Sequence, residues 1–188
     1  MSTPSHPPTT FGPSALATPA NAVTVARLLA TPLLMATVVA RGASWLTFGL
    51  WFVIAGTDGL DGIVARRMGT TRSGAFLDPL ADKVCVLGAM VALVSKGTFW
   101  WVPVALIGAR EFGLVAYRSW LARRGVSMPA SRGAKVKTLT QSLAVGAALF
   151  PPTARHPMFA DALLWAAVVL TLGTGVQYLA DGQRAFAA

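Results

Sequence analysis

The chain has 188 residues, of which 54% are hydrophobic and only 12% charged, and its mean hydropathy is +0.59. Soluble domains carry about a quarter charged residues, so this composition excludes an ordinary soluble domain and favours a protein whose solvent is lipid. The lone Cys85 excludes a disulfide-stapled domain. The net charge of +9 does not indicate nucleic-acid binding, because the Lys and Arg residues stand at the ends of apolar stretches and form no continuous basic patch.

The chain begins with a polar segment, residues 1–21. This segment holds five of the twelve prolines, several Ser and Thr, and no Lys or Arg. Such a composition cannot bury an apolar core, so we expect a disordered tail. We expect residues 22–188 to form a single transmembrane domain.

Six apolar stretches follow the tail. Each is close to the roughly 20 residues that a membrane-spanning helix needs, and together they cover residues 22–40, 44–67, 73–95, 99–121, 135–151 and 158–180. Long segments of strict apolar and polar alternation, which strands would require, are absent from the sequence. The sequence therefore predicts an all-α, polytopic membrane protein with six transmembrane helices and both termini on one side.

The basic residues fall mainly in the second and fourth connections between these stretches. The second carries Arg66, Arg67 and Arg72, and the fourth carries Arg123, Arg124, Arg132, Lys135 and Lys137. The other connections carry one each, namely Arg41, Lys96 and Arg155. Because cationic loops stay in the cytoplasm, we expect a multi-pass protein of the cell membrane whose termini and active site face the cytoplasm.

Four of the seven acidic residues lie close together in the sequence: Asp58, Asp61, Asp78 and Asp82. The first two lie near the end of the second predicted helix and the last two near the start of the third, and in each pair the spacing puts both carboxylates on one helix face. The short connection makes these helices antiparallel neighbours, so all four carboxylates can converge. Carboxylates at membrane depth are costly unless they are paired, hydrated or bound to a cation, so we expect this cluster to be functional.

Hard divalent cations are the expected occupants of such a cluster. All-oxygen ligands favour Mg²⁺ or Mn²⁺, and a pair of ions suits a displacement at phosphorus. Gly62 and Ala65 leave space beside the carboxylates for a bulky ligand, and the planar guanidinium of Arg66 could hold a phosphate at the edge of the acidic face. The alternative is a structural or ion-conducting carboxylate group.

The same residues resemble the signature of the CDP-alcohol phosphatidyltransferases. Its eight fixed positions are carried by Asp58-Gly-Leu-Asp61-Gly62-Ile-Val-Ala65-Arg66 and Gly74-Ala-Phe-Leu-Asp78-Pro-Leu-Ala-Asp82. Seven residues separate Arg66 from Gly74, one fewer than the pattern more often has. Softer similarities to the bacterial phosphatidylglycerophosphate synthases of this family lie at Pro19 to Arg27 with Pro32, at Arg110-Glu111, and at Lys135-Val-Lys137-Thr138 followed by Gln141.

The resemblance implies a phospholipid-synthesising enzyme in which an alcohol attacks a CDP-activated lipid and releases CMP. The donor would be CDP-diacylglycerol, the acceptor glycerol 3-phosphate, and the cofactor two Mg²⁺ or Mn²⁺ ions. The resemblance also implies a homodimer, for which the candidate close-packing points are Gly49, Gly56, Gly173 and Gly175.

The resemblance also implies roles for individual residues. Asp58, Asp61, Asp78 and Asp82 would bind the metals, and Asp82 would also be the general base. The residues that contact the CDP-lipid would be Asn21, Thr24, Gly62, Ala65, Arg66, Thr71 and Gly74, with Thr71 assigned by its position in the loop.

An anionic acceptor needs cations close to the metals. The candidates are Arg110 and Arg118 in the fourth predicted helix and Lys135 and Lys137 at the start of the fifth. For the two lysines, anchoring at the cytoplasmic interface explains the sequence equally well. Arg110 and Glu111 lie deep in their helix, so we expect them to pair with other buried groups, lining the site or fixing a helix.

Three other functions share part of this pattern. A synthase of the same family with inositol phosphate, phosphatidylglycerol or serine as acceptor would carry the same acidic signature. An intramembrane prenyltransferase also binds diphosphate through aspartates, but its motifs lack the step from Gly62 to Arg66 and the spacing from Gly74 to Asp82. A cation transporter would hold its carboxylates near the membrane midplane, and here they lie toward one edge.

Overall fold

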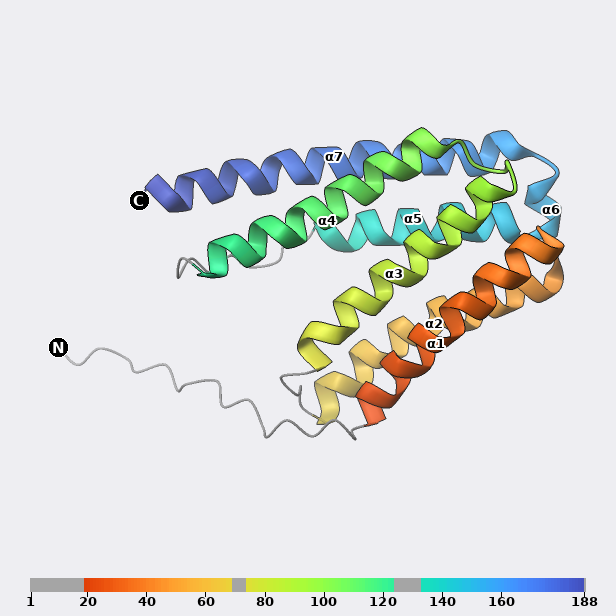
Figure 1. Cartoon of the computed structure of the whole chain (residues 1–188), viewed down its shortest axis with the longest axis horizontal. Coiled ribbons are helices and arrows are strands. Elements are labelled where there is room, and N and C mark those ends of the chain that lie inside the picture. The colour runs from red at the N-terminus through yellow and green to blue at the C-terminus, as the bar shows by residue number, and fades with distance from the viewer. Residues whose placement is uncertain (1–18, 69–73, 124–132, 188) are drawn as a thin grey trace.

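The structure is a computed structural model that describes residues 19–68, 74–123 and 133–187, with side chains for 24–57, 81–117, 119–121 and 136–180. Within these ranges every regular element is a helix (Figure 1). The helices are α1 (Pro19–Arg41), α2 (Trp45–Met68), α3 (Gly74–Ser95), α4 (Trp101–Arg123), α5 (Gly133–Leu149), α6 (Pro151–Ala154) and α7 (Pro157–Ala187).

The long helices confirm the all-α prediction and coincide with the six apolar stretches. α1 begins at Pro19, slightly before residue 22, where the sequence predicted the end of the tail. The sequence did not predict α6, which has only four residues and starts with two prolines after the extended Phe150. Proline fits the first positions of a helix because its missing N–H would have no partner there, and it favours an extended residue before it. The tail itself, residues 1–18, lies outside the described residues.

The helices run back and forth between the two ends of the bundle, with α1, α2 and α3 inclined to α5 and α7 (Figure 1). The starts of α1, α3 and α5 and the ends of α2, α4 and α7 lie toward the left of the view, and the connections α1–α2, α3–α4 and α5–α7 lie at the right. α1 packs against α2 and α3, whereas α7 packs against α4 and α5. α3 and α5 join these two groups, because α3 also contacts α4 and α5, and α5 also contacts α2.

α1 and α3 approach each other closely at Gly88. A Cβ atom at this position would lie 3.1 Å from the Sδ of Met35 and 3.2 Å from the Cγ2 of Thr31, which is tighter than ordinary van der Waals contact. The buried face of α1 therefore meets α3 directly. Its members recur every three or four residues, as one helix face requires, and are Thr24, Arg27, Thr31, Leu34 and Val38.

The interior of the bundle divides into an apolar and a polar half. The apolar half lies toward the connections at the right of Figure 1, and its buried residues include Leu34, Val38, Trp51, Ile54, Met90, Leu93, Ile107, Val145, Leu149 and Leu164. The polar half lies toward the opposite end, and its buried polar side chains are Thr24, Arg27, Thr31, Glu111, Lys137, Gln141 and Thr171. In the apolar half the buried Thr47 donates to the carbonyl oxygen of Gly42, in the connection after α1. Burying polar and charged groups costs free energy, so their collection in one half indicates a site there.

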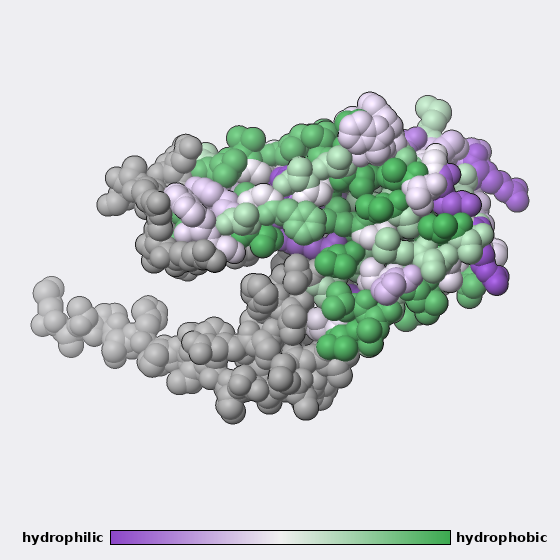
Figure 2. Space-filling view, viewed as in Figure 1, coloured by the Kyte–Doolittle hydropathy of each residue, from purple (hydrophilic) through white to green (hydrophobic). Residues whose placement is uncertain are grey.

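The described face of the bundle in Figure 2 is largely apolar. Large exposed side chains include Leu29, Phe52, Val53, Phe112, Val169 and Val176. Hydrophilic residues gather at the right of the view, where the connections containing Arg41, Lys96 and Arg155 lie. In the part of the chain with described side chains, two helical segments are long and apolar enough to cross a membrane, Thr24–Arg41 and Pro157–Ala180. The count of six spans stays a prediction.

Candidate functional site

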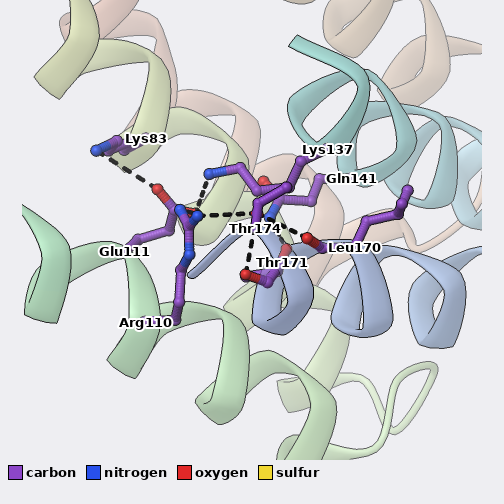
Figure 3. A network of polar contacts seen from close by, with 8 residues as sticks. All are labelled: Lys83, Arg110, Glu111, Lys137, Gln141, Leu170, Thr171 and Thr174. Atoms are coloured by element: carbon purple, nitrogen blue, oxygen red, sulfur yellow. Dashed lines mark hydrogen bonds and ion pairs between the residues drawn. The ribbon is translucent and has the colours of Figure 1, made fainter. Parts of the chain in front are cut away.

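A network of charged and polar side chains is centred on Glu111 of α4 (Figure 3). Glu111 is only 3% exposed, and its carboxylate meets three cations. The Nζ of Lys137 on α5 donates to Oε1, and the same oxygen accepts a hydrogen bond from Nη1 of Arg110 at 3.1 Å. The Nζ of Lys83 on α3 lies 3.4 Å from Oε2. One carboxylate therefore ties α3, α4 and α5 together, and the prediction that Arg110 and Glu111 pair with buried groups is confirmed.

Arg110 extends the network to α7. Its Nη2 donates to Oγ1 of Thr174 at 2.9 Å, and that hydroxyl lies 2.7 Å from the carbonyl oxygen of Leu170. The stem of Arg110 passes directly over the backbone of Gly175, where a Cβ atom would lie 3.2 Å from Nε. Beside these residues, Nε2 of Gln141 on α5 donates to Oγ1 of Thr171 on α7 at 3.0 Å. Two hydrogen bonds thus hold α7 in place: Arg110 to Thr174 joins it to α4, and Gln141 to Thr171 joins it to α5.

The network has more positive than negative charge. Three cations surround one carboxylate, which leaves a surplus of two positive charges among the residues drawn in Figure 3. The side chains of Lys137 and Arg110 are 5% and 13% exposed, so water does little to screen them. Buried cations are stable only when anions compensate them. The arrangement is therefore suited to an anionic ligand.

The predicted acidic cluster lies on the two helices that end and begin at this side of the bundle. Asp58 and Asp61 are in the last turns of α2, and Asp78 and Asp82 are in the first turns of α3. Asp82 has a described side chain, and it is partly buried; the side chains of the other three lie outside the described residues. The described side chains alone contain no group of three or more metal-ligating residues. The metal set stays a prediction.

Asp82 and the start of α1 lie at a similar height in the bundle. α1 and α3 run in the same direction (Figure 1), and Gly88 contacts Thr31 and Met35. Six residues before Gly88 is Asp82, about 9 Å along the helix, and the same step back from Thr31 and Met35 leads to Val25 and Leu29. Thr24, which is only 4% exposed, directly precedes Val25. The structure therefore brings this predicted lipid-binding residue to the level of the predicted base.

Other predicted site residues have helical positions but no described side chains. Asn21 lies in α1, Gly74 is the first residue of α3, and Gly62, Ala65 and Arg66 lie in α2. Arg118 and Lys135 lie in α4 and α5, and Thr71 lies in a segment outside the described residues. Sequence reasoning missed Lys83 and Thr174 entirely. For Lys83 a signal existed, because a cation that directly follows the acidic signature inside an apolar helix requires a partner.

The fold and the polar network define a helical bundle with a largely apolar surface and a cation-rich polar interior at one end. Comparison with known proteins specifies the class further. Residues 17–173 match the family model described as CDP-alcohol phosphatidyltransferase. The chain therefore belongs to the CDP-alcohol phosphatidyltransferase family, as its signature indicated. This family is generally dependent on divalent metal ions.

Curated relatives cover most of the chain. A probable phosphatidylglycerophosphate synthase of Mycobacterium tuberculosis (strain H37Rv) is 37% identical over 183 residues, covering 92% of this chain and 85% of the relative. The CDP-diacylglycerol–glycerol-3-phosphate 3-phosphatidyltransferase of Escherichia coli (strain K12) is 42% identical over 144 residues, covering 72% and 79%. The protein of the same name from Haemophilus influenzae is 38% identical over 144 residues, covering 74% and 78%.

Proposed function

We propose that this chain is a membrane transferase that moves the phosphatidyl group of CDP-diacylglycerol to glycerol 3-phosphate, giving phosphatidylglycerophosphate and CMP. Curated relatives at 37–42% identity carry the names of this activity. The structural observation that carries the proposal is the contact between Lys83 and Glu111, at 3.4 Å. Lys83 directly follows Asp82 in α3, so this contact connects the cation-rich network around Glu111 with the acidic signature. A site for an anionic acceptor would therefore lie beside the metal-binding carboxylates.

The donor side of the proposed site consists of the acidic signature. The donor set is entirely carboxylate oxygen, which suits Mg²⁺ or Mn²⁺, and Asp58, Asp61, Asp78 and Asp82 would hold two such ions. When bound, these ions would neutralise the diphosphate and stabilise the departing CMP. The lipid head would lie against the small residues of α2 and the start of α1, with contacts from Asn21, Thr24, Gly62, Ala65, Arg66, Thr71 and Gly74.

The acceptor side consists of the cations around Glu111. A phosphomonoester carries nearly two negative charges at neutral pH, which matches the surplus of two positive charges in the network. Arg110 and Lys137 would bind that phosphate, with Arg118 and Lys135 as further candidates on the same helices. Serine, a zwitterion without a phosphate, would leave these cations uncompensated. The charge balance therefore favours a phosphorylated acceptor.

Asp82 would act as the general base in the transfer. The acceptor hydroxyl has a high pKa, so its proton must be removed as the hydroxyl attacks phosphorus. Asp82 and Lys83 are consecutive residues, so an acceptor whose phosphate lies in the cationic network can present its hydroxyl near Asp82. The reaction then needs no covalent enzyme intermediate.

The proposed membrane arrangement has six spans and both termini in the cytoplasm. The polar end of the bundle would face the cytoplasm, where glycerol 3-phosphate is dissolved, and the apolar surface in Figure 2 would contact lipid. We further propose a homodimer.

The proposal is tested by CMP release from the purified, detergent-solubilised protein. The reactions contain CDP-diacylglycerol and Mg²⁺, and they offer glycerol 3-phosphate, inositol phosphate, serine or phosphatidylglycerol separately. We expect release with glycerol 3-phosphate only, and loss of release with EDTA. Release with inositol phosphate alone would keep the phosphate site but reassign the acceptor. Absence of CMP release with every acceptor, together with metal flux in sealed vesicles, would favour the cation transporter.

A matched pair of variants tests the acceptor site. Lys137→Gln removes a buried cation of the network, whereas Lys96→Gln removes an exposed cation at the opposite end of the bundle. We expect the first to raise the KM for glycerol 3-phosphate by at least about tenfold, which corresponds to the loss of one charge-assisted hydrogen bond. The second should leave the KM unchanged. Equal KM values for the two variants would refute the proposed acceptor site.

A further inference from the structure

We propose that two consecutive residues of α7, Thr174 and Gly175, position Arg110 for the acceptor phosphate. Neither belongs to the acidic signature, and neither carries charge. The inference rests on the proposed function, because it assigns a specificity role to residues that act through Arg110. Figure 3 shows the side chain of Arg110 extending from α4 toward Thr174.

The hydroxyl of Thr174 is oriented toward Arg110 as an acceptor. A hydroxyl has one proton, and in Thr174 this proton is directed to a backbone carbonyl of α7, either Leu170 at 2.7 Å or Thr171 at 3.1 Å. The oxygen lone pairs then remain for Nη2 of Arg110, at 2.9 Å. Arg110 is therefore the donor and Thr174 the acceptor in this contact. The hydroxyl could point its proton toward Arg110 only by breaking its hydrogen bond to the α7 backbone.

Gly175 provides the space in which Arg110 lies. A Cβ atom on this residue would lie 3.2 Å from Nε of Arg110, closer than an ordinary van der Waals contact, and 3.4 Å from its Cγ. An added methyl group would therefore require the arginine stem to shift by a few tenths of an ångström. The neighbouring Gly173 differs sharply, because a Cβ atom there would meet nothing within 4 Å.

The guanidinium is thereby fixed at both ends. Nη1 donates to Glu111 at 3.1 Å, and Nη2 donates to Thr174 at 2.9 Å, which defines the plane of the group. Each terminal nitrogen carries two N–H bonds, so each keeps one further donor for a ligand oxygen. Bidentate recognition of phosphate depends on the orientation of this plane, because both N–H bonds must point at the ligand together. A change in α7 that shifts the guanidinium of Arg110 would therefore weaken binding of the acceptor phosphate without affecting binding of the CDP-lipid.

The experiment compares KM values for the two substrates in four variants. Thr174→Val removes the acceptor oxygen at nearly constant volume, and Thr174→Ser restores it. Gly175→Ala displaces Arg110, and Gly173→Ala is its matched control on the same helix. We expect Thr174→Val and Gly175→Ala each to raise the KM for glycerol 3-phosphate about tenfold, the effect of one misplaced charge-assisted hydrogen bond. Thr174→Ser and Gly173→Ala should stay within about twofold of wild type, and the KM for CDP-diacylglycerol should not change.

A second measurement separates positioning from simple loss of structure. In an Arg110→Lys background, Thr174→Val should add less than about a twofold change, because the residue through which Thr174 acts is already altered. If Gly175→Ala does not fold, the two Thr174 variants still decide the question. Equal increases in both KM values, or no increase in either variant, would overturn the inference while wild type remains active. A wild type that releases no CMP with glycerol 3-phosphate would overturn the proposed function and this inference with it.

Discussion

Replacing Glu111 by Gln is expected to be the most destabilising single change in the polar network. Gln keeps the shape and one acceptor oxygen, so the change removes the charge that compensates Lys83, Arg110 and Lys137. Breaking a buried ion pair from one side costs about 3–5 kcal/mol. The contact with Lys83, whose side chain is 30% exposed, adds less than about 1 kcal/mol. A loss of about 4 kcal/mol corresponds to a fall in Tm of about 8–16 °C for a chain of this size.

The assay is thermal unfolding of the purified protein in one detergent, followed by tryptophan fluorescence. Lys83→Gln is the control, since it removes the weakest of the three contacts, and its Tm should fall by no more than about 4 °C. The double variant Glu111→Gln with Lys137→Gln should be more stable than Glu111→Gln alone, because it leaves no unpaired Lys137 charge. A Glu111→Gln protein with the Tm of Lys83→Gln would refute the idea that Glu111 compensates the buried cations.

Three further changes test the helix packing, the proposed base and the membrane topology. Gly88→Ala should destabilise the protein by about 1–3 kcal/mol, because the added methyl group meets a side chain of α1 at 3.1 Å, and thermal unfolding measures the loss. Asp82→Asn should lower CMP release by at least about 100-fold while CDP-diacylglycerol still binds, as equilibrium binding would show. In a Cys85→Ser background, a cysteine placed by His156→Cys should react with a membrane-impermeant maleimide in intact cells, and one placed by Ser119→Cys should react only after permeabilisation.

Each of these three experiments has a result that would contradict the reasoning behind it. Gly49→Ala adds a methyl group where nothing lies within 4 Å, so a loss equal to that of Gly88→Ala would show that the close contact is not the cause. An Asp82→Asn protein with full activity would remove the base assignment. Labelling of both cysteines from the same side would exclude the proposed six-span arrangement, because Ser119 and His156 lie toward opposite ends of the bundle.

The long helices could be predicted from the sequence because lipid imposes a minimum apolar length on each span. That constraint does not act on the connections. α6 has four residues and no apolar period, and it forms where two prolines follow Phe150 and where Thr153 donates to the carbonyl oxygen of Ala147 at 2.6 Å. Such contacts depend on the end of the preceding helix, so they could not be read from local composition.

The site could be predicted where charge itself was the signal. Arg110 and Glu111 are conspicuous inside an apolar stretch, and the structure pairs them with Lys137, for which the sequence left interfacial anchoring as an equal alternative. Thr174 was not predicted, since an isolated threonine in an apolar helix is ordinary and its partner Arg110 is 64 positions away. Gly175 was interpreted as a point of close packing in a homodimer, and the structure instead places Arg110 of the same chain against it. Contacts between distant segments leave no period in the sequence.

The position of α3 explains how one chain can bind two different substrates beside each other. Consecutive residues of a helix point about 100° apart. The Nζ of Lys83 contacts Glu111 of α4, and α3 also packs against α1 and α5. α3 thus carries both Asp78 and Asp82 of the acidic signature and Lys83 of the cationic network. A substitution that shifts α3, such as Gly88→Ala, should therefore raise the KM of both substrates, whereas changes in α7 should affect the acceptor alone.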